Sequence, residues 1–468
     1  MSDSVAKRSP EMDRLNMLAL KGRALMGGTR AMREASQEYL PKFEAESAEA
    51  YSARLKSSWL FNGYRKTVRD MTGRVFEKPV EIVQGSARLQ GWATNIDMAG
   101  RDLSAFARDV FEDGLDAGIA WIMVDAPSRE GTVTRAQAER DNLRPFLVHL
   151  RTEDVLGVRV ETVGNVQRVT MLRIMETLKE VDPADEFATL SIDQVRVLDV
   201  DGARVRTRLF RKQGKDEKWA QWGDEAFGDM SEITVVPFYA NRTGFWQAEP
   251  LLDDLADINI AHWQSQSDQR NILHFARVPV FVRTGWTDES SPLAIGAATS
   301  MDSSNPDAKA MWVEHSGRAI GAGRQDLKDL EFQMETHGLQ LLAARAQSAT
   351  GEALDAKKET SQLASIADNL RDALERALQW MTIYAGAEES VSANVNTDFG
   401  ISMMTAQELG VMLQAVQTGN LSRATFLAEM VRRGALRSDI TPEEEAERIA
   451  AQEPTLTGEP MGLDDAAA

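Results

Sequence analysis

The sequence contains no cysteine among its 468 residues. This absence excludes a disulfide framework, and it excludes a thiolate as metal ligand or catalytic nucleophile. The sequence also has no apolar run of the length that crosses a membrane, and Met1–Pro10 carries no apolar core of a signal peptide. We therefore expect a protein that is made and kept in a cytoplasm and that does not enter a membrane.

Basic residues are scarce relative to acidic ones. The chain has 53 Lys and Arg against 72 Asp and Glu, which gives a formal net charge of −19. A protein that binds nucleic acid tightly does so by neutralising phosphates with Lys and Arg. The charge balance therefore disfavours tight binding of nucleic acid, but it is compatible with a protein that lets nucleic acid pass without sticking.

Histidine is scarce too, and the common catalytic motifs are absent. A structural role is the favoured interpretation for each of the five scattered histidines: His149, His262, His274, His315 and His337. The sequence has no phosphate-binding G-x-x-x-x-G-K-[ST], no H-E-x-x-H and no G-x-S-x-G. A calcium loop starting at Asp199 would need glutamate where Phe210 stands. We therefore predict no enzyme activity, no metal site and no cofactor.

The strongest pattern in the chain runs from Arg324 to Ala385. Apolar residues recur there at alternating spacings of three and four in two blocks, which predicts two long amphipathic helices. The blocks are Leu327, Leu330, Met334, His337 and Leu341, then Leu363, Ala367, Leu370, Leu374, Leu378 and Met381. Between them, Thr350 is suited to cap the second helix, and Gly351 gives the backbone freedom to turn. Alone, this pattern is also compatible with an ordinary helical hairpin in a core.

Elsewhere the chain mixes helices and strands. We predict helical pieces interrupted by glycines over 1–50, and one amphipathic helix over 51–78 that ends at Pro79. Basic residues such as Arg54 occupy its other faces, either as a solvated face or as a contact surface for an acidic neighbour or a phosphate backbone. Further helices are predicted over 103–113, 250–271, 406–417 and 423–433, and strands over 119–124, 146–150, 166–176, 193–200, 203–212, 218–222, 233–239, 277–282 and 392–399. Asp201-Gly202 predicts a hairpin turn between two strands. The fold class that follows is α+β.

Four stretches carry recognisable motifs in a fixed order. The first runs from Tyr51 through Asn62 to Pro79, and the second leads from Gly114 through a buried strand to Pro127. The third has Asp257-Ile258-Asn259 followed by Ser267-Asp268, and the fourth is Thr350-Gly351-Glu352-Ala353-Leu354-x-x-Lys357-Lys358. Their order and spacing resemble the portal proteins of tailed bacteriophages, in particular a portal-like group catalogued only as a domain of unknown function. The third resembles the first stem helix of that group, and the fourth resembles the start of its tunnel helix.

The resemblance implies a portal fold with an α/β wing, a long-helix stem, a small clip subdomain, a tunnel helix and a helical crown. The implied parts are an N-terminal arm (1–50), the wing (51–249 and 386–405), two stem helices (250–274 and 324–343), the clip (275–323), the tunnel loop (344–352), the tunnel helix (353–385), the crown (406–455) and a disordered tail (456–468).

The resemblance also implies a function without catalysis. A homo-oligomeric ring, a dodecamer by the resemblance, would stand at one vertex of the capsid in the virion after assembly in the cytoplasm of a bacterial host. The implied partners are double-stranded DNA passing through the channel, terminase, a head–tail adaptor, the major capsid protein and a scaffold protein. The residues implied to lie at the DNA channel or tunnel loop are Gln347, Ser348, Thr350, Gly351, Lys357 and Lys358.

An acidic ring suits a conduit on physical grounds. Repeated around an axis, the charge of this chain gives a repulsive field, and a few lysines near the lumen damp it. Two alternatives remain open on the sequence alone. One is another virion or scaffold protein without a DNA channel, and the other is a nuclease with dispersed carboxylates.

Overall fold

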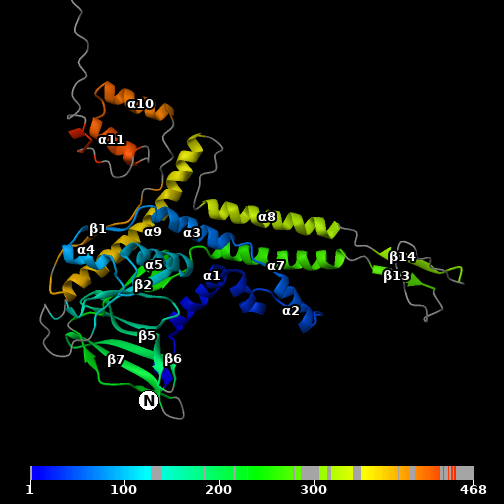
Figure 1. The fold of residues 1–468 in the computed structure, drawn as a ribbon, viewed down its shortest axis with the longest axis horizontal. Coiled ribbons are helices and arrows are strands. Elements are labelled where there is room, and N and C mark those ends of the chain that lie inside the picture. Colours follow the sequence, from blue (N-terminus) through cyan, green and yellow to red (C-terminus); the bar gives the residue numbers. More distant parts are fainter. Residues whose placement is uncertain are drawn as a thin grey trace, which may run out of the picture. The chain divides into compact units, whose positions relative to one another are not determined.

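The computed structural model divides the chain into two compact units, Met1–Thr397 and Asp398–Ala468. It describes residues 3–127, 137, 140–183, 185–213, 218–228, 230–277, 280–285, 305–313, 318–340, 349–387, 389–397, 399, 406–432, 436, 441, 444–445 and 447–448. The first unit combines helices with several sheets, which confirms the α+β class (Figure 1). Among the described residues, no helix has the length and apolarity that a bilayer crossing requires.

The N-terminal region forms two helical pieces that meet at a kink at Gly28, which confirms the predicted interruption at a glycine. After the short 3₁₀ helix η1 (Asp3–Val5), helix α1 runs over Pro10–Ala35, and η2 (Ser36–Glu38) follows it. Gly28 is the one position where the helical backbone is broken, with φ of 74°, a conformation that glycine adopts without strain. Met12, Leu25 and Met32 are at most 1% exposed, so α1 belongs to the core.

The helix predicted over 51–78 is wrong as a single element. The structure has α2 (Ala48–Ser57) and α3 (Gly63–Val75) with a break between them. Ser58 ends α2 in an extended conformation. The side chain of Asn62 then accepts a hydrogen bond from the amide of Arg65 at 2.8 Å, which starts a new helix in the manner of an N-cap.

A three-stranded sheet lies at the centre of the first unit. Its order is β10 (Val235–Tyr239), β2 (Ile119–Asp125) and β3 (Phe146–Leu150), all antiparallel neighbours. Helix α5 (Leu103–Ala117) leads into β2 through Gly118, whose φ is 83°. Helix α4 (Ala87–Ala93) precedes α5. The predicted helix over 103–113 and the predicted strand over 119–124 are confirmed.

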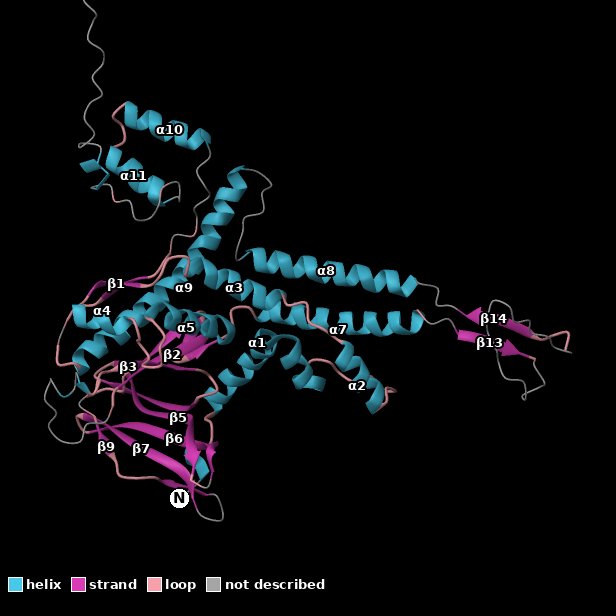
Figure 2. Ribbon diagram, viewed as in Figure 1, coloured by secondary structure: helices cyan, strands magenta, loops and turns pink. Residues whose placement is uncertain are grey.

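A larger antiparallel sheet follows in the chain (Figure 2). Its strands are β4 (Val155–Val163), β5 (Val166–Asp182), β6 (Asp185–Asp201), β7 (Arg204–Gln213) and β8 (Lys218–Gln221) in that order, with β9 (Ala226–Phe227) beside β7. One face packs against the central sheet and α1 through residues such as Leu172, Ile174 and Trp121. The hairpin predicted at Asp201-Gly202 exists, but Asp201 pairs with Arg204, so the turn itself is Gly202-Ala203.

The remaining strands form two-stranded sheets. Strands β11 (Arg242–Gly244) and β12 (Gln247–Ala248) pair with each other, and β1 (Glu81–Gln84) pairs with β15 (Ser392–Asn394). Strands β13 (Val280–Thr284) and β14 (Lys309–Val313) form an antiparallel hairpin between helices α7 (Asp253–Ala276) and α8 (Arg318–Gln340).

Helix α9 (Ala349–Tyr384) completes the core of the first unit. The six apolar residues predicted as its buried stripe, from Leu363 to Met381, are all at most 2% exposed. The side chain of Trp380 is also buried and donates a hydrogen bond to Glu232 at 2.9 Å. The second unit contains α10 (Ala406–Gln417) and α11 (Arg423–Arg432), close to the predicted bounds. There Thr441 caps a helical turn by accepting from the amide of Glu444 at 3.2 Å.

Candidate functional site: helices α7 and α8 and the start of α9

Helix α7 carries the motif that the sequence singled out, and its polar residues face inward. Asn259, His262, Gln266 and Ser267 are at most 6% exposed, and Trp263 lies fully buried between them. These positions recur at three and four, so they share one face of the helix. This face is polar because it packs against backbone groups and a buried arginine rather than against a purely apolar core.

Asn259 connects α7 to the start of α3. Its side-chain amide donates to the carbonyl of Phe61 at 2.8 Å, and its side-chain oxygen accepts from the amide of Tyr64 at 2.9 Å. The first amides of a helix have no partner within the helix. The asparagine predicted as a family landmark is therefore a structural residue that satisfies the buried beginning of α3.

A second contact joins α7 to α2 through Arg54. The guanidinium forms hydrogen bonds of 2.8 and 2.9 Å to the two carboxylate oxygens of Glu46, and this partner holds the pKa of Glu46 below its ordinary value. The hydroxyl of Ser58 donates to that of Ser267 at 2.8 Å. Arg54 is 4% exposed, so the solvated alternative is wrong for this residue, and its acidic neighbour is Glu46.

Helices α7 and α8 run antiparallel and are joined by polar contacts (Figure 1). His262 lies 3.4 Å from Glu331, Ser265 donates to Asp326 at 2.5 Å, and Gln269 donates to the carbonyl of Ile320 at 3.0 Å. In these three contacts the residue numbers rise along α7 and fall along α8, which is the pattern of an antiparallel pair. Burial is the main cause that lowers the pKa of His262, which favours the neutral imidazole in this contact.

Close approach of backbones fixes the position of α8. A Cβ atom on Gly323 would lie 2.2 Å from the side chain of Gln269, and one on Gly338 would lie 2.6 Å from the hydroxyl of Thr67 in α3. Met334 is 3% exposed. The predicted stripe of α8 therefore continues from Met334 to Gly338, and not to His337, which is exposed. Leu341 lies outside the described residues.

The remaining faces of α8 are open and mostly acidic. Its exposed charged side chains are the bases Arg324 and Lys328 and the acids Asp326, Asp329, Glu331 and Glu335. Phe332 is 54% exposed beside them. Together, α7 and α8 give a rigid pair with one face held by α2 and α3 and another face available to solvent or to a second molecule.

The structure describes only some of the residues predicted to lie at the DNA channel. Gln347 and Ser348 lie outside the described residues. Thr350, Gly351, Lys357 and Lys358 lie on the backbone of α9, which begins at Ala349. The helix thus starts earlier than the predicted boundary at 353, and Thr350 is inside the helix rather than before it. The assignment of these residues to a DNA channel stays a prediction.

A buried ionic cluster beside α1 was not predictable from the sequence. Arg23 bonds to Asp116 at 2.9 Å and also pairs with Asp113, while the hydroxyl of Tyr64 donates to Asp116 at 2.8 Å. His149 lies 3.2 Å from Asp113. These groups are far apart in the sequence, so no spacing could reveal them. No cluster of metal-ligating side chains occurs within the described part of the chain.

Comparison with known proteins gives one family match and weak structural likenesses. The family model "Domain of unknown function (DUF4055)" matches residues 250–385, the segment that holds α7, the β13–β14 hairpin, α8 and α9. No curated protein matches the chain.

Two solved chains are similar to this one at low identity. A chain from "Neck of native GTA particle computed with C12 symmetry" is 12% identical, with 78% of this chain and 88% of that chain covered and a TM-score of 0.37. A chain from "Neck of empty GTA particle computed with C6 symmetry" is 13% identical, with coverages of 79% and 88% and the same TM-score of 0.37.

Proposed function

We propose that this chain is the subunit of a phage portal, a ring that serves as a structural connector at one vertex of a virion. The ring would be the channel for packaging and ejection of double-stranded DNA and the docking site for terminase and the head–tail adaptor. Contacts with the major capsid protein and a scaffold protein belong to the same proposal. So do the dodecameric state, assembly in a bacterial cytoplasm and the absence of catalysis.

The observation that carries the proposal is the antiparallel helix pair α7–α8. The β13–β14 hairpin lies between these two helices in the chain, and the long helix α9 follows them. Of the four motifs that resemble portal proteins, the third lies on α7 and the fourth at the start of α9, while the first two precede them on α2–α3 and on the end of α5 with β2. The structure gives the motif of α7 a physical role, because Asn259 and Ser267 attach the pair to α3 and α2. A rigid pair held at one face is what a ring wall requires of each subunit.

The β13–β14 hairpin supports association with other copies. Met311, Trp312 and Val313 are 47%, 53% and 49% exposed, and among the described residues the hairpin consists of two strands. A lone two-stranded hairpin is marginally stable in water. In a closed ring with head-to-tail contacts, each hairpin would obtain its missing packing from a neighbouring subunit.

The charge of the chain supports a channel through which DNA slides. Its net charge of −19 and the excess of acids on the open face of α8 would keep a duplex from adhering. Gln347, Ser348, Thr350, Gly351, Lys357 and Lys358 would lie nearest to the DNA, and the two lysines would damp the repulsion.

Electron microscopy of the purified protein, alone and with its scaffold protein, tests the proposal. We expect end-on class averages that show closed rings with an axial opening wide enough for a DNA duplex. A Trp312→Asp variant should form fewer rings, whereas the same change at exposed Phe187 on β6 should not reduce them. Compact particles without an opening under both conditions would contradict the proposal, as would metal-dependent cleavage of DNA that a single carboxylate substitution abolishes.

A further inference from the structure

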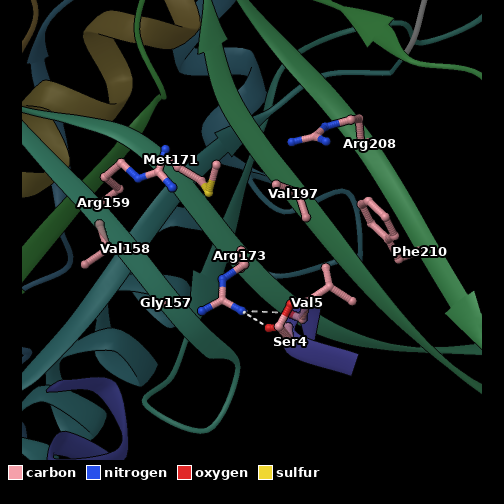
Figure 3. Close-up of a pocket in the computed structure, with 10 residues that line it drawn as sticks. All are labelled: Ser4, Val5, Gly157, Val158, Arg159, Met171, Arg173, Val197, Arg208 and Phe210. Carbon is pink, nitrogen blue, oxygen red and sulfur yellow. Dashed lines mark hydrogen bonds between the residues drawn. The ribbon is translucent and has the colours of Figure 1, made fainter. Parts of the chain in front are cut away.

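The face of the larger sheet that points away from the central sheet is hollowed by a pocket. The hollow has a volume of about 450 Å³ and lies over β4 to β7, with Ser4 and Val5 of η1 at one side (Figure 3). Strand pairing places residues of the pocket in a row across the sheet. Arg173 of β5 pairs with Gly157 of β4 on one side and with Val197 of β6 on the other. Val197 pairs in turn with Arg208 of β7.

Arginines line this pocket although the chain as a whole is acidic. Arg159, Arg173 and Arg208 all border the hollow. Arg208 is neutralised, since Asp199 accepts hydrogen bonds from both Arg206 and Arg208 at 2.6 and 2.9 Å. One buried carboxylate therefore serves two arginines on β7.

Arg159 and Arg173 have no acidic partner in the part of the chain that the structure describes. One nitrogen of Arg173 donates to the backbone carbonyls of Ser4, Val5 and Lys7 at 2.8, 2.8 and 2.9 Å. These bonds fix the side chain without neutralising its charge. Burial and the nearby Arg159 lower the pKa of Arg173, which is the response of a cation that lacks a counter-ion.

The floor of the pocket is apolar. Val197 and Phe210 are 3% and 7% exposed, and both belong to a small core cluster on this face of the sheet. Gly157 leaves the space that the guanidinium of Arg173 occupies, because a Cβ atom there would lie 2.5 Å from its nitrogen. The pocket thus combines the fixed guanidinium of Arg173 and the exposed side chain of Arg159 with an apolar surface.

We propose that this pocket binds an acidic peptide segment of a partner protein, with a carboxylate side chain on Arg159 and Arg173 and an apolar side chain on Val197 and Phe210. Arginine favours carboxylate because its planar fork forms charge-assisted hydrogen bonds with both oxygens. A DNA backbone suits the site less well, because a continuous line of phosphates would extend past the pocket to Asp201 at the end of β6 and Glu225 in the loop before β9, both beside Arg206. This inference does not depend on the proposed ring.

Fluorescence anisotropy tests the assignment with the full chain and a fluorescein-labelled peptide of the sequence Glu-Glu-Leu-Glu-Phe-Asp. We expect saturable binding that the matched peptide with Gln and Asn in place of the acids does not show. Arg159→Gln should weaken binding by about tenfold, the usual effect of losing one charge-assisted contact. Arg204→Gln provides the control, because Arg204 is exposed on β7 and does not line the pocket; it should change binding by less than about twofold.

Three results would overturn the proposal. They are equal binding of the neutral peptide, binding that Arg159→Gln leaves unchanged, and no binding of the acidic peptide at millimolar concentration. Tighter, Arg159-dependent binding of a labelled DNA duplex would also overturn it and would assign the pocket to nucleic acid. Circular dichroism of each variant establishes that the sheet is intact.

Discussion

At the scale of single residues, the polar side chains buried in the first unit hold helices together. Asn259 satisfies the beginning of α3, and Arg54 joins Glu46 to the region of Ser267. Burying such groups without partners is costly, whereas paired groups fix one geometry of approach. The polar motif of α7 therefore has a structural role within the chain itself, because it joins α7 to α2 and α3.

Replacing Asn259 with alanine should destabilise the protein strongly. The change leaves the amide of Tyr64 buried without a partner, which costs about 1–3 kcal/mol, whereas the carbonyl of Phe61 keeps its hydrogen bond from the amide of Gly63 at 3.2 Å. We expect a loss of about 1–3 kcal/mol in the free energy of unfolding, measured by urea titration. Asp257→Ala, two positions earlier, is the control because the side chain of Asp257 is 64% exposed; a cost as large as that of Asn259→Ala would contradict this account.

The carboxyl of Asp116 should make stability depend on pH. Burial is the largest influence on it and raises its pKa from 3.8 to about 6. The folded protein therefore favours the neutral acid, and the contribution of Asp116 to stability is lost as the pH rises from about 4 through about 6. Asp116→Asn removes this loss while it keeps an oxygen for the hydroxyl of Tyr64.

The free energy of unfolding of Asp116→Asn, minus that of the wild type, should thus rise between pH 4 and pH 7. A shift of about two pKa units corresponds to about 3 kcal/mol. Urea titrations at several pH values measure the difference. Asp70→Asn, which removes an exposed ion pair with Lys66, is the control and should give a nearly constant difference. A difference for Asp116→Asn that falls with pH would mean that the pairing with Arg23 outweighs burial.

At the scale of elements, the sequence predicted best where one face of a helix is continuously buried. The stripe from Leu363 to Met381 was recognisable because α9 packs against strands and helices along its length. The stripe of α8 was misread at His337, since Gly338 takes the inward position by allowing close approach to Thr67. The spacing of apolar residues does not reveal a close contact that glycine allows because it has no side chain.

Breaks and extensions of elements were harder to predict for a related reason. The break between α2 and α3 depends on Asn62 as a cap, although the apolar spacing continues across it. Strands β5 and β6 extend to Asp182 and from Asp185, well past the predicted ends, because their outer halves pair with each other rather than with a core. Four of the six predicted site residues lie near the start of α9: Thr350, Gly351, Lys357 and Lys358. The sequence predicts that a helix begins there, but it does not determine what surrounds these side chains.

At the scale of the whole molecule, the packed core belongs to the first unit. Every apolar side chain that is buried among the described residues lies between Met12 and Val395. In the second unit, α10 exposes Val411 and Leu413 at 64% and 46%. Two short helices with such exposure do not form an independent core, since isolated helices of this length are marginal in water.

A chain that ends at Thr397 should therefore keep the fold and the stability of the full protein. Urea titration should give a free energy of unfolding for residues 1–397 that agrees with that of the full chain within about 10%, the uncertainty of the extrapolation. Circular dichroism should show the same strand signal and a smaller helical signal, because α10 and α11 are removed. A clear drop in the midpoint would mean that the second unit stabilises the first in the monomer. An unchanged midpoint would mean that Val411 and Leu413 do not contribute to the stability of the first unit. Their exposed apolar side chains would then be available to pack against another molecule.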